Sequence, residues 1–237
     1  LPNPAAVDRP QRFPAQGPRR KRVALLAGCV QTVVAPQINE ATVRLLTRLR
    51  CEVVVAEGAG CCGGIVHHMG RDGRDYARRN IDAWLRAEGE GKFDAVVHLA
   101  AIPAPGLLAN ARTFKNNVPA SYNVFLAARQ AGIRNVVFAS SETVLGLPFD
   151  NPPPYVPVDE EYYPRPESAY SLGKLLDETM ARQFARWDPE LKIVGLRFSN
   201  VMDPEDYKVF PSFDADPKLR KWNLWGYIDA RDGAQAV

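Results

Sequence analysis

Short apolar runs alternate with amphipathic stretches along most of this chain. Five runs have the length of buried strands and are rich in branched apolar side chains: residues 23–26, 52–56, 95–100, 136–140 and 192–198. The stretches between them carry apolar residues at helical spacing, at residues 38–49, 76–85, 118–131 and 172–184. Strands that are apolar on both faces are typical of parallel sheets. The pattern predicts a doubly wound, mainly parallel α/β sheet of the Rossmann-like type in a single domain.

Two proline-rich stretches interrupt this alternation. Residues 1–18 hold prolines at positions 2, 4, 10, 14 and 18, so we expect residues 1–21 to form an arm or linker and order to begin at Arg22. Residues 147–168 hold seven prolines and follow a predicted strand. We expect this long loop to lie above the carboxyl edge of the sheet, where ligands bind.

The net charge and the lengths of the apolar runs limit the kinds of partner that we expect for this protein. The net charge is +3 and mixed in sign, which favours neither a nucleic-acid footprint nor a membrane patch. The one dense basic run, residues 19–22, is interpreted as a solvated linker end, the alternative being a localisation or phosphate patch. No apolar run has the length of a membrane span, and the start lacks a signal-peptide core. We therefore expect a cytoplasmic protein with no nucleic-acid or membrane partner.

A tyrosine and a lysine four residues apart are candidate catalytic residues at the start of the last predicted helix. Tyr170 and Lys174 have the spacing of a hydride-transfer acid/base pair, and Ser141 ends the apolar strand before them. A phenol titrates near pH 10, so it needs a neighbouring cation to favour the phenolate and a hydroxyl to share the substrate oxygen. Lys174 and Ser141 fit these two roles. The alternative is a half-buried aromatic beside a solvated lysine.

Further motifs in the second half strengthen the functional interpretation. They occur in this order: Phe93-Asp-Ala-Val-Val-His-Leu-Ala-Ala101, Asn117-Val118, Val136-Val-Phe-Ala-Ser-Ser-Glu-Thr-Val-Leu-Gly146, Tyr170-x-x-x-Lys174 and Leu196-Arg-Phe-Ser-Asn-Val201. In order and spacing, residues 93–237 resemble extended short-chain dehydrogenases/reductases, the NAD-dependent epimerase/dehydratase family. The resemblance implies Tyr170 as general acid/base and Ser141 as the group that binds the reacting oxygen. It implies that Lys174 holds the nicotinamide ribose and lowers the tyrosine pKa.

The same resemblance implies the rest of a binding site. Ala100 and Ala101 would line the dinucleotide cleft, Asn117 would support the site from the following helix, and Asn200 would face the substrate. The cofactor would be NAD or NADP and the substrate a sugar or nucleotide-sugar alcohol. The helices that begin near Val118 and Ala169 resemble those that pair across the family's dimer, so we expect a homodimer.

The first half lacks the glycine-rich turn of that family. The first strand runs into residues 27–36, which hold one glycine where the fingerprint has three. Gly58-Ala-Gly-Cys-Cys-Gly63 has the spacing of such a turn, but it follows the second strand, so it is a weak candidate for a phosphate loop. We therefore expect cofactor binding to be weakened.

A second resemblance accounts for this half. Leu25-Leu-Ala-Gly-Cys-Val30, Cys51-Glu-Val-Val-Val55, Gly60-Cys-Cys-Gly63 and His67-His68 make residues 22–92 similar to half of the cysteine-rich (CCG) domain of the glycolate oxidase iron-sulfur subunit. Cys29, Cys61 and Cys62 match three of that domain's five cysteines. The last two have no counterpart, so we expect no metal site; the alternative uses His67 or His68 as a fourth ligand. Together, the two resemblances predict that the chain is a chimera joined near residue 93.

Three hypotheses about function remain open. The first is an NAD(P)-dependent oxidoreductase or epimerase, impaired by the loss of the glycine-rich turn. The second is a non-catalytic α/β scaffold built from two families, and the third is a fragment of an iron-sulfur electron-transfer subunit. Binding of NADH separates the first from the second, and colourless, metal-free protein excludes the third.

Overall fold

The structure, a computed structural model, describes residues 6–25, 27, 36–60, 74–89, 93–99, 101–202 and 204–237. The chain divides into two compact units, residues 1–96 and 97–237, and each is described by itself. Both units combine helices with pairs of parallel strands, and the first unit also has one antiparallel pair. Parallel pairs outnumber this one, which confirms the predicted mainly parallel α/β class. That one sheet runs through both units stays a prediction.

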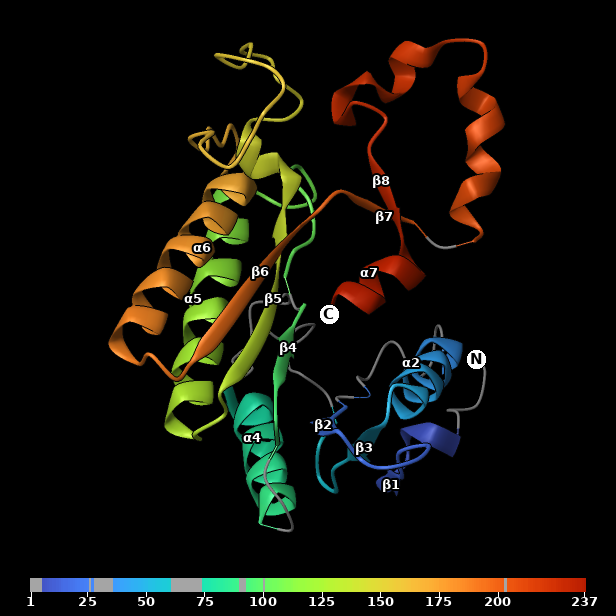
Figure 1. Ribbon diagram of the computed structural model, residues 1–237, viewed down its shortest axis with the longest axis vertical. Coiled ribbons are helices and arrows are strands. Elements are labelled where there is room, and N and C mark those ends of the chain that lie inside the picture. Colours follow the sequence, from blue (N-terminus) through green and yellow to red (C-terminus); the bar gives the residue numbers. More distant parts are fainter. Residues whose placement is uncertain are drawn as a thin grey trace. The chain divides into compact units, whose positions relative to one another are not determined.

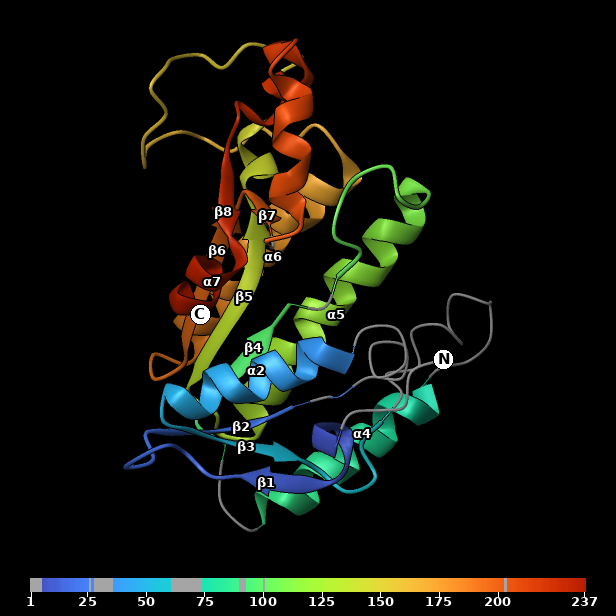
Figure 2. The ribbon, with the colours of Figure 1, turned by 90° about the vertical axis from the view of Figure 1, so that its right-hand side faces the viewer.

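The first unit is built on a three-stranded sheet in the order β1-β3-β2 (Figure 2). Its elements are η1 (Ala6–Asp8), β1 (Gln11–Phe13), β2 (Lys21–Ala24), α2 (Pro36–Arg48), β3 (Cys51–Val55) and α4 (Arg74–Glu88). β2 and β3 run parallel, with Val23 opposite Val53. Val53, Val54 and Val55 are buried and α2 packs along β3, so the central strand carries this core.

The amino-terminal stretch corrects one prediction. Residues 1–21 were expected to form an arm, yet β1 lies within them and pairs antiparallel with β3, Gln11 opposite Val55 and Phe13 opposite Val53. Prolines 10 and 14 flank this strand instead of interrupting it. Proline is tolerated at the ends of an edge strand, because that strand uses only one side of its backbone for pairing.

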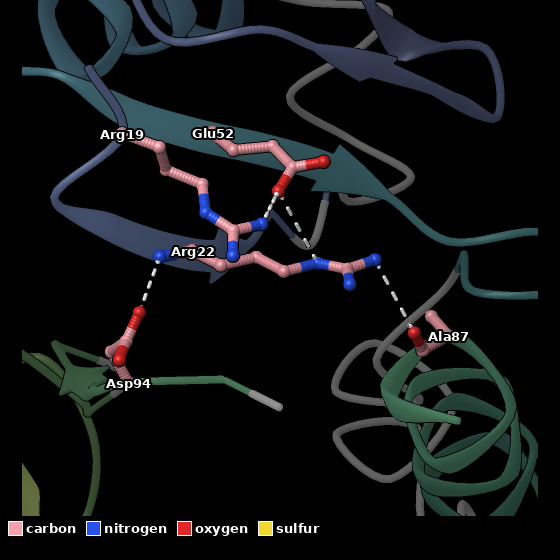
Figure 3. A network of polar contacts seen from close by, with 5 residues as sticks. All are labelled: Arg19, Arg22, Glu52, Ala87 and Asp94. Carbon is pink, nitrogen blue, oxygen red and sulfur yellow. Dashed lines mark hydrogen bonds and ion pairs between the residues drawn. The ribbon is translucent and has the colours of Figure 1, made fainter. Parts of the chain in front are cut away.

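Arg22 is the polar centre of the first unit (Figure 3). The residue stands on β2 and is only 1% exposed. Its backbone N–H donates to Asp94 Oδ2 at 2.8 Å, its Nη2 donates to the Ala87 carbonyl at 3.3 Å, and its Nε lies 3.7 Å from Glu52 Oε2. The side chain therefore joins β2 and β3 to the end of α4, while its backbone joins β2 to the segment before β4.

Replacing Arg22 with alanine is expected to lower the free energy of unfolding by about 2–3 kcal/mol, because it removes charge-assisted bonds and the packing of the buried stem. Arg19 provides the control. It also contacts Glu52, at 2.7 Å, but its side chain is 58% exposed, so Arg19→Ala should cost less than about 1 kcal/mol. Urea unfolding of both variants checks this, and equal losses would contradict the assignment.

The second unit contains the sheet β4-β5-β6 and the two longest helices. Its elements are β4 (Val96–His98), α5 (Asn110–Gln130), β5 (Asn135–Ser141), η2 (Glu142–Leu145), α6 (Ala169–Trp187), β6 (Lys192–Phe198), β7 (Asn200–Met202), η3 (Asp206–Phe213), η4 (Pro217–Asn223), β8 (Tyr227–Asp229) and α7 (Ala230–Ala236). α5 and α6 lie side by side against β5 and β6 (Figure 1). β5 and β6 are parallel and in register, with Ser141 opposite Phe198 at their carboxyl ends.

The buried face of α6 differs from the apolar stripe that the sequence suggests. Leu172 is 42% exposed, whereas Tyr170, Lys174 and Asp177 are buried along with Ala181 and Phe184. α5 likewise buries Asn117 and Ser121, while Tyr122 is 43% exposed. Both helices therefore bury polar residues beside apolar ones such as Phe125 and Phe184, which is unusual for core faces.

Two contacts hold β5 and β6 in place, and the first of them also involves α6. Glu178 accepts two hydrogen bonds from Arg197, both of 2.8 Å, and a third from Ser140 Oγ at 2.6 Å, so one carboxylate joins α6, β5 and β6. Gly195 lies against the ring of Phe138: a Cβ at that position would come within 2.6 Å of the ring. Only glycine leaves room for this ring on β6.

Candidate functional site

The first turn of α6 places Tyr170. Ser168 is the N-cap: its side chain accepts from the Ser171 backbone N–H, and the Ser171 hydroxyl in turn accepts from the Ser168 N–H, which forms a capping box. The cap fixes where the helix begins, and Tyr170 follows two residues later. Tyr170 is 7% exposed.

Ser141 meets Tyr170 from the end of β5. Its Oγ accepts from the Thr143 N–H at 3.2 Å and from Thr143 Oγ1 at 3.0 Å. These bonds occupy the lone pairs of the serine, so its own proton is directed to another acceptor. Ser141 hydrogen-bonds the Tyr170 phenol in a way that favours the phenolate. The structure thus brings together the two residues that were predicted to bracket a substrate oxygen.

Lys174 lies one turn further along α6 and is 4% exposed. Its Nζ donates to the Ala139 carbonyl of β5 at 2.5 Å and lies 5.8 Å from the centre of the Tyr170 ring. Burial lowers the pKa of this ammonium, and the carboxylate of Asp177 partly restores it. The lysine is therefore held against β5, beside the aromatic ring of Tyr170.

The ionisation of Tyr170 differs from the expectation. Lys174 was expected to lower the tyrosine pKa, but burial raises it; the Ser141 hydrogen bond opposes this effect and the charge of Asp177 adds to it. The physical reason is that Lys174 is turned to a carbonyl and is balanced by a buried acid. Without ligand, Tyr170 is a protonated phenol at neutral pH.

Comparison with known proteins shows the family of the chain. Residues 36–233 match the model of the NAD dependent epimerase/dehydratase family, which is most of the chain. The chain belongs to this family. The match begins on the amino-terminal side of residue 93, where the predicted resemblance starts.

Curated relatives support both predicted resemblances. A "Bifunctional UDP-glucose 4-epimerase and UDP-xylose 4-epimerase 1" of Pisum sativum is 32% identical over 152 residues, 63% of this chain and 41% of the relative. The "Glycolate oxidase iron-sulfur subunit" of Escherichia coli (strain K12) is 40% identical over 84 residues, 35% of this chain and 20% of that protein. The chain thus spans less than half the length of either relative, and the two matches together are consistent with a chimera.

A solved structure supports the fold. The "UDP-Glc/GlcNAc 4-epimerase from the human pathogen Campylobacter jejuni" aligns with a TM-score of 0.51 at 21% identity and covers 76% of this chain and 53% of that protein. At this identity the likeness concerns the fold alone. The chain therefore shares the α/β architecture of the epimerase/dehydratase family.

Asn117 braces the segment that follows β4. Its Oδ1 accepts from the Ile102 N–H at 2.9 Å and its Nδ2 donates to the Ile102 carbonyl at 3.1 Å. Asn117 thereby fixes the backbone next to Ala101, which was predicted to line the dinucleotide cleft. The predicted role of Ala100 lies outside the described residues. Asn200 is exposed at the start of β7, directly after the end of β6.

The proline-rich loop is attached to the end of β5 just beyond Ser141. Tyr162 donates its hydroxyl proton to the Leu145 carbonyl at 2.9 Å, and the Arg165 N–H donates to the Val144 carbonyl at 2.9 Å. Both acceptors belong to η2, which begins at Glu142. These bonds place the loop on the carboxyl side of β5, as expected for a loop that covers a ligand site.

Three ionisable residues near the site were not singled out by sequence reasoning. Asp177 is fully buried on α6, and burial raises its pKa to about 6, although Lys174 and Ser121 favour its charged form. His98 ends β4, and burial together with the charge of Lys174 lowers its pKa to about 4. Glu142 follows Ser141, and burial raises its pKa to about 7 against the pull of Arg220. For Asp177, one signal was available in the sequence: an acidic residue one helical turn after Lys174 lies on the same face of the helix.

His98 should give the protein a distinct stability profile in acid. A base whose pKa is depressed in the folded state contributes stability that is present above its ordinary value of 6.5 and is lost as the pH falls toward 4. Asp177 acts in the opposite sense, because its raised pKa makes the folded state gain stability as the pH falls through 6. The two effects partly cancel in the wild type, so a variant is needed to separate them.

Between pH 7 and pH 4.5, the free energy of unfolding should fall by about 2–3 kcal/mol less in His98→Gln than in the wild type. Glutamine keeps a group that can bond Ser121, whose Oγ lies 3.2 Å from His98 Nε2. Urea unfolding at several pH values measures the difference. Parallel curves for the two proteins would show that His98 is not the titrating group.

The residues proposed for metal binding lie outside the part of the chain that the structure describes: Cys29, Cys61, Cys62, His67 and His68. Among the described residues there is no group of three or more potential ligands that could hold a metal ion. Within the same residues, no helix combines the length and the apolar character needed to cross a bilayer.

Proposed function

We propose that this chain carries the acid/base site of an NAD-dependent sugar-nucleotide epimerase, in which Ser141, Tyr170 and Lys174 act on a secondary alcohol of a UDP-sugar. The observation that carries the proposal is the buried arrangement of these three side chains at the carboxyl end of β5. Family membership and the UDP-sugar epimerases among the relatives support it.

The residues present fit the nicotinamide end of NAD. Lys174 carries three protons, and the hydrogen bond described for it uses one, to the Ala139 carbonyl. The two other protons suit the hydroxyls of a ribose. Asn117 holds the backbone beside Ala101, as a fixed wall for the cofactor requires. When bound, NAD supplies a hydride acceptor.

In the proposed reaction, Ser141 donates a hydrogen bond to the oxygen of the sugar alcohol and so places it next to the Tyr170 oxygen. Tyr170, as phenolate, would remove the hydroxyl proton of the alcohol, and NAD, when bound, would supply the hydride acceptor and donor that oxidation to a ketone and its reversal require. Tyr170 would return the proton to the ketone oxygen when the epimer forms. No net oxidation results, and Tyr170 regains its starting state.

A homodimer is proposed on the surface of α5 and α6. Tyr122 and Leu172 are large apolar residues that are 43% and 42% exposed in this unit. Exposed aromatic side chains of this kind are enriched at protein interfaces.

Titration with NADH, followed by its fluorescence, tests the proposed function. Binding at micromolar strength supports the enzyme, and no binding at millimolar concentration favours the scaffold hypothesis. Lys174→Ala should weaken binding by at least tenfold, because the ribose loses a charged donor. Lys192→Ala, which removes an exposed lysine at the start of β6, is the matched control and should bind as the wild type does.

A further inference from the structure

Asp177 has an environment that stability alone does not explain. It is fully buried on α6, and within the described residues neither carboxylate oxygen has a hydrogen-bond partner of normal geometry, although the Ser121 hydroxyl lies close enough to favour the charged form. A buried carboxylate without good hydrogen bonds is costly. Replacement by an apolar residue would relieve this cost, so its presence in the core suggests a role.

The carboxylate faces the site from one helical turn away. Residues three apart on a helix are neighbours on its surface, so Asp177 and Lys174 share the buried face of α6. Its charge favours the protonated form of both neighbours: it adds to the effect of burial that raises the pKa of Tyr170, and it opposes the effect of burial that lowers the pKa of Lys174. Tyr170, Lys174 and Asp177 therefore form one electrostatic unit along α6.

The surrounding elements leave Asp177 as the anion of this unit. From β4, His98 is neutral at physiological pH, because its pKa lies near 4. From α5, Ser121 is uncharged. On α6 itself, Glu178 is neutralised by two hydrogen bonds from Arg197 of β6. Among these neighbours, Lys174 is the cation that Asp177 balances.

We propose that Asp177 is a positioning residue of the Ser141/Tyr170/Lys174 site, a buried counter-charge that holds the Tyr170–Lys174 pair in its protonated form. The inference rests on the proposed function, because it assigns Asp177 the task of setting when Tyr170 becomes a base. With Asp177 ionised, the phenol keeps its proton and the lysine its charge. The ligand-free site is thus kept as an acid, and the base form is reached at higher pH.

The test follows the ionisation of Tyr170 and Lys174 in the ligand-free protein, so it needs neither NAD nor a substrate. Protein labelled with ¹³C at tyrosine Cζ and ¹⁵N at lysine Nζ is titrated by NMR, with the two signals assigned by Tyr170→Phe and Lys174→Ala. Asp177→Asn should lower the pH at which the pair loses its first proton by about one unit, a tenfold shift in the equilibrium. Asp177→Glu, which keeps the charge, should titrate close to the wild type.

An unchanged titration of both groups in Asp177→Asn would overturn the proposal. If that variant does not fold, the wild type still decides: its Tyr170 and Lys174 signals should both shift with a midpoint near pH 6, where Asp177 takes up its proton. The absence of that midpoint would equally overturn it. In an active protein, the rising limb of kcat/KM against pH should move down by the same unit in Asp177→Asn. Failure of NADH to bind, with the NMR shifts intact, would reject the proposed function and not the electrostatic assignment.

Discussion

Replacing Tyr170 with phenylalanine is expected to lower the rate of the proposed UDP-sugar epimerisation by about 10²–10⁴-fold, the range by which a positioned acid/base group contributes to catalysis. The change removes one oxygen and leaves the ring in place. KM should change little, because the phenol acts mainly on the reacting proton. The measurement is kcat and KM with NAD at saturation.

Tyr122→Phe is the matched control for this experiment. It removes the same oxygen from an exposed tyrosine on the neighbouring helix, so its rate should equal that of the wild type. Both variants should unfold within about 1 kcal/mol of the wild type, since each loses at most one neutral hydrogen bond. Equal activity of Tyr170→Phe and Tyr122→Phe would remove Tyr170 from the mechanism.

Replacing Phe125 with alanine is expected to cost about 3–5 kcal/mol of unfolding free energy, the largest stability effect that we predict. Phe125 is fully buried on α5, and its ring makes edge contacts with Phe138 of β5 at 5.3 Å and with Phe184 of α6 at 5.8 Å. The alanine would leave a cavity where both helices meet the sheet. Because the same helices hold Asn117 and Tyr170, activity should also fall as the temperature approaches the lowered melting point.

Phe114→Ala controls for the loss of a phenyl ring from α5. Phe114 is 36% exposed, so little cavity forms and the cost should stay near or below 1 kcal/mol. Urea denaturation of both variants measures the difference. Similar losses would mean that the aromatic cluster around Phe125 does not stabilise the fold as its geometry indicates.

Helices and strands could be predicted where a short stretch of sequence carries its own pattern of apolar residues. The run at residues 192–198 became β6 with the expected bounds, and the motif at 136–141 became β5. The Tyr170 helix was also located, because its body has apolar residues at helical spacing. These signals depend on neighbouring residues and need no knowledge of the tertiary structure.

The faces of the helices were not predictable in the same way. Leu172 suggests a core position, but α6 buries Lys174 and Asp177 instead, because the side that meets β5 belongs to the site. Apolar spacing alone assigns every buried position to packing. Likewise, β1 was missed because its partner, β3, lies far along the chain and its own sequence has no apolar run.

The sequence was sufficient to predict which residues form the candidate site, but not the pKa values of those residues. Spacing and motif order identified Ser141, Tyr170 and Lys174, which the structure brings together. The pKa of Tyr170 depends on burial and on Asp177, and both follow from how α6 packs on the sheet. No pattern along the sequence shows that Lys174 is turned toward the Ala139 carbonyl.

The fate of the hydrogen on the reacting carbon tests the central claim most directly. UDP-glucose with deuterium at carbon 4 is incubated with the protein and NAD in ordinary water, and the 4-epimer is analysed by mass spectrometry and NMR. If the Ser141/Tyr170/Lys174 site transfers a hydride to NAD and returns it, the epimer keeps its deuterium and Tyr170→Phe forms almost none. Loss of the deuterium to water would contradict the account. So would the absence of any conversion by protein that is folded and binds NADH.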